Sequence, residues 1–203
     1  MRLFSYKLLH DTGFAPNPFH DVCTLATCKP RIRLSKRVGD WIAGFTSTGL
    51  NGDPLGGERL IYLMQVSQKL GLDEYHRTRA FAAKIPRPGA SRCVDRAGDN
   101  IYYLEAGRMK QVENPNHDLS DMEKDTSGEF VLVGRRFYYF GSRPLVVPDR
   151  LRPDVPRAQA AHGVQTHDSA RALAFIDFVD SQGRGVHAPP HRWPEGDESW
   201  RQP

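Results

Sequence analysis

The apolar residues of this chain gather in short runs that are rich in aromatic and β-branched side chains, and these runs limit the fold more than any other feature. The clearest is LIYLMQV at residues 60–66. A second run, FVLVGRRFYYF at residues 130–140, is divided by a glycine and two arginines, which predicts one bulged strand or two joined strands. Runs of this kind favour strands over long helices, so we expect a mostly β chain with short helices.

Other segments extend this interpretation. Residues 1–9 alternate apolar and polar side chains, as a strand does. Residues 40–45 predict a further strand, and a glycine-rich turn joins it to residues 60–66 as a hairpin with a long tip. The APNP sequence at residues 15–18 cannot be helical, because each proline removes an amide donor and holds its predecessor in extended geometry. Residues 110–127 are polar, and we expect them to be irregular.

Three short helices are predicted from residues that are typical of helix ends. A proline opens residues 30–38 and Gly39 follows them, although the alternation of Ile32 and Leu34 also permits a strand. Asp73 suits the start of a helix over residues 73–83, and Asp168 suits the start of a C-terminal helix over residues 168–182. The length of 203 residues fits one α+β domain over residues 1–183, followed by an irregular tail with prolines and tryptophans at 184–203.

Charge and cysteine content suggest the setting of the protein. The formal net charge is +4, and arginines gather at residues 31–37, 135–136 and 143–157. A basic face would suit a phosphate-bearing partner, although arginines that are simply solvated fit the sequence equally well. Three cysteines and the lack of a signal sequence predict a cytoplasmic protein with reduced thiols. No apolar run approaches the ~20 residues of a membrane helix, so we expect no membrane partner.

Residues 11–41 contain three side chains suited to catalysis or metal binding, which are His20, Cys23 and Cys28. A zinc site would need distant ligands such as Cys93 or His76, and the Cys-x4-Cys spacing is looser than a usual zinc knuckle. A catalytic thiolate would need His20 as its base, with arginines nearby. Packing of both cysteines in a buried wall is the favoured interpretation. We therefore expect no metal and no cofactor.

The sequence VGDWIAG at residues 38–44 adds a clue about architecture. A basic short helix, a Gly-Asp turn and two apolar strands follow one another here. In this layout the chain resembles the PUA-like superfamily, which includes the ASCH, EVE and YTH domains. The resemblance implies a mostly antiparallel, partly closed β-barrel with short flanking helices and a C-terminal helix, of the kind that binds nucleobases.

A closer resemblance covers most of the chain. The sequences DTGFAPNPFHDVCTLATCKPRIR, GDWIAG, LIYLMQV, GDNIYY and FYYFG resemble the nucleotide modification associated domain family, second type. Its members are bacterial and phage proteins associated with DNA base modification systems. The resemblance implies a role in making or recognising modified bases. It assigns no catalytic residue.

Two classes of function follow. A binding protein would hold a nucleobase or nucleotide in a basic, aromatic-lined pocket. The candidate contacts are Phe14, Phe19, Arg31, Arg33, Trp41 and Tyr62. An enzyme would act on the base or nucleotide through His20 with Cys23 or Cys28, or through Asp40, and Asp11 is a further acid–base candidate. We favour binding, with a nucleic acid, a nucleotide or a base-modification enzyme as the partner.

Overall fold

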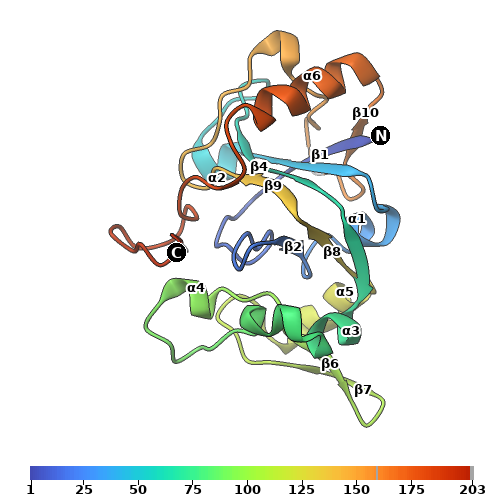
Figure 1. The fold of residues 1–203 in the computed structure, drawn as a ribbon, viewed down its shortest axis with the longest axis vertical. Coiled ribbons are helices and arrows are strands. Elements are labelled where there is room, and N and C mark those ends of the chain that lie inside the picture. The colour runs from blue at the N-terminus through green and yellow to red at the C-terminus, as the bar shows by residue number, and fades with distance from the viewer. Residues whose placement is uncertain (159, 202–203) are drawn as a thin grey trace.

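A six-stranded mixed sheet crosses the middle of the molecule in the order β10-β1-β3-β4-β9-β11 (Figure 1). The computed structural model describes residues 1–158 and 160–201. In this sheet β1 pairs with β3 and β9 pairs with β11 in parallel, whereas the other neighbours are antiparallel. The strands are β1 (Leu3–Lys7), β3 (Trp41–Phe45), β4 (Leu60–Gln65), β9 (Arg136–Tyr139), β10 (Val164–Thr166) and β11 (Gly185–Val186).

A second, smaller sheet and a hairpin lie below the first sheet in Figure 1. The antiparallel order of the second sheet is β2-β8-β5, formed by β2 (Cys23–Leu25), β8 (Phe130–Gly134) and β5 (Gln68–Gly71). The hairpin consists of β6 (Tyr102–Glu105) and β7 (Arg108–Gln111).

Short helices fill the connections. The α-helices are α1 (Pro30–Ser35), α2 (Thr48–Asn51), α3 (Leu72–Arg77), α4 (Cys93–Arg96), α5 (Met122–Thr126) and α6 (Ser169–Asp180). The 3-10 helices are η1 (Arg79–Lys84), η2 (Leu119–Asp121) and η3 (Asp149–Leu151).

The two sheets share continuous chain segments. The segment that ends β4 runs on into β5, and β8 runs on into β9 through Arg135. At this crossing a Cβ atom on Gly134 would lie 2.9 Å from the carbonyl oxygen of Gln65, so only glycine permits the close approach. The apolar run at residues 130–140 therefore forms two joined strands, one in each sheet, which was one of the two predicted alternatives.

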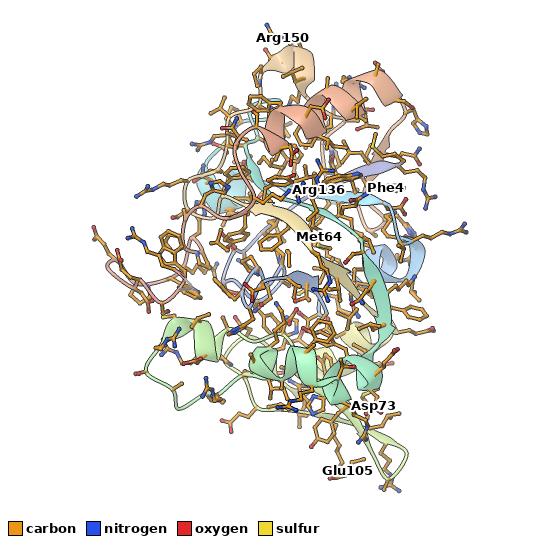
Figure 2. All side chains as sticks on the ribbon, viewed as in Figure 1. Phe4, Met64, Asp73, Glu105, Arg136 and Arg150 are labelled. Carbon is orange, nitrogen blue, oxygen red and sulfur yellow. The ribbon has the colours of Figure 1, made fainter. Side chains whose placement is uncertain are left out.

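The core consists of packed layers on both faces of the six-stranded sheet. On one face, Phe175, Ile176 and Val179 of α6 pack against strands β1, β3, β4 and β9. On the other face, Met64, labelled near the centre of the molecule in Figure 2, belongs to a cluster that reaches β2 and β8. A sheet covered on both sides needs apolar residues at consecutive positions, which explains the unbroken run in β4.

The expected barrel is wrong, whereas the α+β class is confirmed. The six-stranded sheet is mixed rather than mostly antiparallel, and it stays open between its edge strands β10 and β11. The hairpin of β3 and β4 is present as predicted. However, the N-terminal strand β1 joins β3 in parallel through a crossover of more than thirty residues, because the segment between them contributes β2 to the other sheet. This sharing between sheets prevents closure of a single barrel.

The helices differ in detail from their predictions. The first ends at Ser35 rather than at residue 38. The helix expected over residues 73–83 divides at Thr78, where ψ is 115°, into α3 and the 3-10 helix η1. Asp168 caps α6 as predicted, because its side chain accepts a hydrogen bond from the Arg171 amide at 3.0 Å. Residues 110–127, expected to be irregular, contain η2 and α5.

The C-terminal segment lies against the N-terminal loop. The Trp193 ring stacks on Phe19 with centroids 5.0 Å apart, and its indole nitrogen donates to the Thr12 carbonyl at 2.8 Å. The division between a domain at 1–183 and a tail at 184–203 stays a prediction, and the last two residues lie outside the described part of the chain. Within residues 1–158 and 160–201, no helix combines the length and the apolar character needed to cross a membrane.

Candidate functional site

A cavity of about 600 Å³ opens where the beginning of α1, the segment before α5 and the loop before β10 meet. Its wall contains apolar residues from the end of β1 and from the APNP loop. The remaining wall is charged or reactive. The residues of this wall that concern the site are Cys28, Lys29, Arg31, His117, Lys124 and Asp125.

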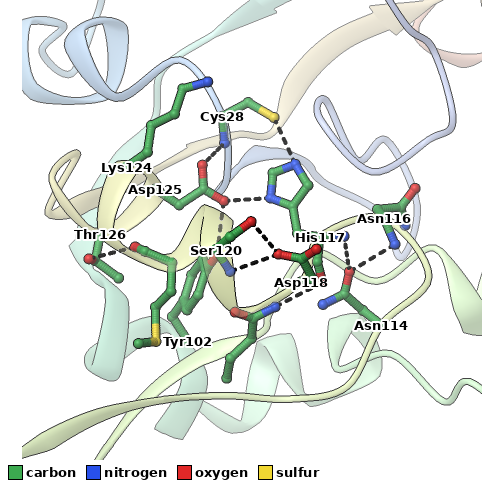
Figure 3. Close-up of polar contacts among 12 residues, drawn as sticks. Cys28, Tyr102, Asn114, Asn116, His117, Asp118, Ser120, Lys124, Asp125 and Thr126 are labelled. Atoms are coloured by element: carbon green, nitrogen blue, oxygen red, sulfur yellow. Dashed lines mark hydrogen bonds and ion pairs between the residues drawn. The ribbon is translucent and has the colours of Figure 1, made fainter.

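Three of these side chains form a connected polar group, which we call the Cys28 triad (Figure 3). The Cys28 sulfur lies 3.4 Å from Nε2 of His117. Nδ1 of His117 lies 2.7 Å from Oδ2 of Asp125. The second oxygen of Asp125, Oδ1, accepts a hydrogen bond from the Cys28 backbone amide at 2.7 Å. Nucleophile, histidine and carboxylate are thus joined in the order used by enzymes with a nucleophilic thiol.

A strained turn after β2 positions Cys28. Cys28 and Lys29 have φ values of 52° and 39°, in the left-handed region that side chains other than glycine rarely adopt. Two hydrogen bonds hold this turn. The Cys28 amide donates to Asp125, and the Cys28 carbonyl oxygen accepts from Nε of Arg33 at 2.8 Å.

Arg33 also fixes the other end of the triad. Its guanidinium is fully buried and donates to the backbone carbonyls of Asp125 and, at 2.8 Å, Phe130. Gly128 makes room for this group, since a Cβ atom there would lie within 2.5 Å of the guanidinium. One cation therefore joins the backbone at Cys28 to the backbone at Asp125.

His117 is held by its own loop and by an aromatic ring. The backbone amides of Asn116 and His117 donate to the Asn114 side chain at 3.0 and 2.8 Å, which closes a tight turn. The ring of Phe14 packs edge-on against the imidazole, with centroids 4.9 Å apart. The imidazole is thereby confined between Phe14 and the carboxylate.

The electrostatic setting of the imidazole is unusual. Burial alone lowers the pKa of His117, but the hydrogen bonds to the Asp125 carboxylate and the Cys28 sulfur outweigh it and raise the pKa to about 10. The Asp125 carboxylate is buried and also accepts from the Tyr102 hydroxyl at 3.0 Å. The histidine is thus a cation at neutral pH, with one N–H toward Asp125 and the other toward the sulfur.

The same three residues offer ligand atoms within 4.8 Å of one another, as a metal site would. However, the Asp125 carboxylate contacts Nδ1 of the imidazole, whereas the Cys28 sulfur contacts Nε2 on the other side of the ring. A metal between Cys28 and Nε2 would therefore have Asp125 as the hydrogen-bond partner of its histidine rather than as a ligand. Two ligands are too few for a resident zinc, so the arrangement fits a nucleophile better than a metal centre.

The two cysteines of the predicted site have different surroundings. Cys23 lies on β2, is fully buried in the core, and has its pKa raised to about 12 by burial. Cys28 is partly exposed at the cavity. Cys93 is buried in α4 and takes a hydrogen bond from Arg96 at 2.9 Å, and His76 contacts Asn100, so neither joins the Cys28 triad.

The acid–base candidates proposed from the sequence lie elsewhere. Burial and the nearby charge of Lys84 lower the pKa of His20 to about 4, and its Nε2 is buried without a hydrogen-bond partner among the described residues. Asp40 forms a bidentate ion pair with Arg2 at 2.8 and 2.6 Å. Asp11 accepts from the Tyr139 hydroxyl and from the His191 amide. Their proposed catalytic roles stay predictions.

The predicted ligand contacts are mostly buried. Phe14, Phe19, Trp41 and Tyr62 have exposed fractions of 2% or less, and none of them is part of the cavity wall. Arg33 is buried in the clamp described above. Arg31 is the one member of that set that lines the cavity.

His117 and Asp125 were not among the residues selected from the sequence. Both belong to the polar stretch that was expected to be irregular. One feature of the sequence could have indicated them. Acidic residues at 118–125 lie before and within a short helix, and His117 directly precedes them. Nothing in the sequence indicates that this stretch, about ninety residues further along the chain, folds back onto Cys28.

Comparison with known proteins identifies a family. The model of the family described as nucleotide modification associated domain 2 matches residues 1–197. No curated protein and no solved structure matches the chain.

Proposed function

Since the chain belongs to the nucleotide modification associated domain 2 family and is thereby associated with nucleotide modification, we propose that it is a thiol enzyme of that process. Cys28 is the nucleophile, His117 the general acid and base, and Asp125 the residue that orients His117. The observation that supports this assignment is the 3.4 Å contact of the Cys28 sulfur with an imidazole whose other nitrogen lies 2.7 Å from a buried carboxylate.

The chemistry that suits this triad is transfer or hydrolysis of an acyl group on a nucleotide or on its modifying group. The thiolate of Cys28 attacks the carbonyl carbon and forms a C–S bond. The bond to the leaving group breaks, its electron pair leaves with that group, and His117 gives the group the proton from Nε2. Water then returns a proton to Nε2 while its oxygen attacks the thioester, which releases the acid and restores the thiolate.

The setting of the triad favours chemistry over a purely structural role. Cys28 is partly exposed at a cavity, in contrast to the other two cysteines, which are buried. Two hydrogen bonds hold the strained backbone at Cys28, whose amide donates to Asp125 and whose carbonyl accepts from Arg33. Strain of this kind concentrates at functional sites.

A generic acyl donor tests the proposal without a known substrate. We expect p-nitrophenyl acetate to give a burst of p-nitrophenol stoichiometric with the protein, and mass spectrometry to find the acetyl group on the peptide that contains Cys28. Cys28→Ser abolishes the burst. His117→Gln lowers its rate by about 10²-fold or more, the usual contribution of a general acid or base.

Cys93→Ser is the matched control, because it removes a thiol outside the cavity. Its burst is expected to equal that of the unmodified protein. Acetylation of Cys28 at the same rate in His117→Gln would refute the proposal, since the sulfur would then react only because it is accessible.

Recognition of a modified base or nucleotide without chemistry is the second candidate. Arg31, one of the contacts selected from the sequence, lines the same cavity as the triad, together with two lysines. A protein that only binds would retain full affinity for its nucleotide in Cys28→Ala and show no acetyl intermediate. An enzyme would form the intermediate.

A further inference from the structure

We infer that the cavity beside Cys28 holds the terminal phosphate of a mononucleotide-sized ligand, through Lys29, Arg31 and Lys124. This inference rests on the proposed function only in taking the cavity as the substrate site. It names the class of ligand, a phosphate monoester, which the family match does not specify.

Three cationic side chains from two segments of the chain meet at this cavity. Lys29 and Arg31 come from the beginning of α1, and Lys124 comes from α5. Figure 3 shows the Lys124 side chain extending past Asp125 to the side of Cys28. The Lys29 ammonium lies 4.9 Å from the centroid of the Tyr6 ring. Nη1 of Arg31 lies 3.4 Å from Nε2 of His162. A phosphate among them would lie next to the sulfur.

Few negative charges of the cavity face Arg31 and Lys124. Asp121 and Asp125 are the carboxylates among the described residues of the wall. Asp125 is committed to the Cys28 amide, the Tyr102 hydroxyl and the His117 ring. Within the described ranges, no ion pair joins Arg31 or Lys124 to a carboxylate.

The like charges also act on one another. Burial lowers the pKa of Lys29, the nearby Cys28 sulfur raises it, and the Lys124 ammonium lowers it. Lys29, Arg31 and Lys124 line the same concave wall. Several cations in one wall favour a polyvalent anion over a singly charged one, because the anion relieves their repulsion. These three cations suit the charge of a phosphate monoester.

The distribution of the other arginines argues against a nucleic-acid backbone as the ligand. Arg33 is buried, Arg136 pairs with Asp180 at 3.0 Å, and Arg152 pairs with the buried Glu58 at 2.7 Å. Arg150 lies at the far end of the molecule, beyond α6 in Figure 2. Binding to a nucleic-acid duplex needs several available cations along one face. These arginines are instead buried, paired with carboxylates or separate from the others. A cavity of about 600 Å³ is of the size that encloses small molecules.

The test uses protection of Cys28 from iodoacetamide, followed by mass spectrometry of the peptide that contains it. The probes are the four 2′-deoxynucleoside 5′-monophosphates, the four 2′-deoxynucleosides, orthophosphate, and a single-stranded oligonucleotide without terminal phosphate. We expect the monophosphates to protect, orthophosphate to protect at higher concentration, and the nucleosides and oligonucleotide not to protect.

Variants locate the binding. Arg31→Gln and Lys124→Gln are each expected to raise the half-protecting concentration of the monophosphates by about tenfold or more, as loss of a charged hydrogen bond does. Protection is measured against the alkylation rate of each variant without ligand. Arg150→Gln is the matched control, because Arg150 is exposed and does not line the cavity, and it should leave protection unchanged.

Equal protection by nucleosides, or unchanged protection in both cavity variants, would overturn the inference. Protection by the oligonucleotide that equals that by the monophosphates would assign the site to a nucleic-acid backbone instead, and would also overturn it. The experiment reads binding alone. A protein that binds monophosphates but forms no acetyl intermediate on Cys28 would refute the proposed chemistry and leave this inference standing.

Discussion

Two polar networks, one that includes Thr24 next to Cys23 and one that includes Cys28, have similar parts and different surroundings. In the first, Asp99 accepts hydrogen bonds from the Tyr75 hydroxyl at 2.7 Å and the Thr24 hydroxyl at 2.6 Å. The second is the Cys28 triad, in which Asp125 accepts from the Tyr102 hydroxyl at 3.0 Å. Each network thus contains a buried carboxylate and a tyrosine that donates to it.

The networks differ in access to solvent. Lys84, which is fully buried, completes the first by donating to Asn17 at 2.6 and 3.0 Å, and burial lowers its pKa to about 8. Burial also raises the pKa of Asp99. Both groups are sealed in the core, so their interactions serve stability. The second network ends at a sulfur that faces a cavity. Access to the cavity, rather than residue type, therefore separates the buried network from the network that we propose to be reactive.

The largest expected effect is the difference in reactivity between the two cysteines. Cys28 should react with iodoacetamide directly, whereas Cys23 reacts only when the core opens. The rates should differ by about four powers of ten, because opening a core costs a large part of the ~5–15 kcal/mol of global stability. Peptide mass spectrometry over time measures both rates. Equal alkylation rates of Cys28 and Cys23 would contradict the difference in solvent access between the two networks.

Breaking the sealed network should have the next largest effect. Lys84→Met removes both hydrogen bonds from the buried ammonium to Asn17 and should lower the free energy of unfolding by about 3–5 kcal/mol, because each hydrogen bond to a charged group contributes about 1.5–3 kcal/mol. Chemical denaturation measures the change. Lys110→Met, at an exposed position, is the control and should alter it by less than about 0.5 kcal/mol. A small effect of Lys84→Met would mean that water reaches this network.

The open network should make stability depend on pH. The folded pKa of His117 is raised to about 10, above its ordinary value of 6.5. The stabilisation is therefore complete below pH 6.5 and is lost as the pH rises through about 10. His117→Gln should cost about 1.5–3 kcal/mol at pH 6, the usual contribution of a charged hydrogen bond, and much less at pH 11.

Denaturation at a series of pH values tests this dependence. His167→Gln is the control, because His167 is exposed, and its stability should follow that of the unmodified protein at every pH. A difference between His117→Gln and the unmodified protein that stays constant from pH 6 to pH 11 would contradict the proposed ion pair.

The smallest expected effect concerns the tyrosine of the open network. Tyr102→Phe removes one hydrogen bond to Asp125 and should lower the free energy of unfolding by about 0.5–1.5 kcal/mol. Tyr103→Phe, next to it in the chain, is the control, because no hydrogen bond of its hydroxyl is found in the described structure. Equal effects of the two variants would show that the Tyr102 hydroxyl contributes nothing specific to the triad.

Much of the local structure follows from the sequence, because it depends on neighbours in the chain. The apolar run of β4, the Asp168 cap of α6 and the hairpin of β3 and β4 were all predicted correctly. Each follows from side-chain pattern or from a cap within a few residues. The predicted helix over residues 73–83 was wrong in its continuity, since the extended backbone at Thr78 divides it.

Sequence alone determined the family, the α+β class and the segment that contains Cys28, the proposed nucleophile. Tertiary structure alone decided that the sheet stays open, that Arg33 is a buried clamp, and that Cys28 rather than Cys23 meets a histidine. The physical reason is distance along the chain. The contacts that expose one sulfur and bury the other join residues about ninety positions apart, and side-chain pattern carries information only over a few positions.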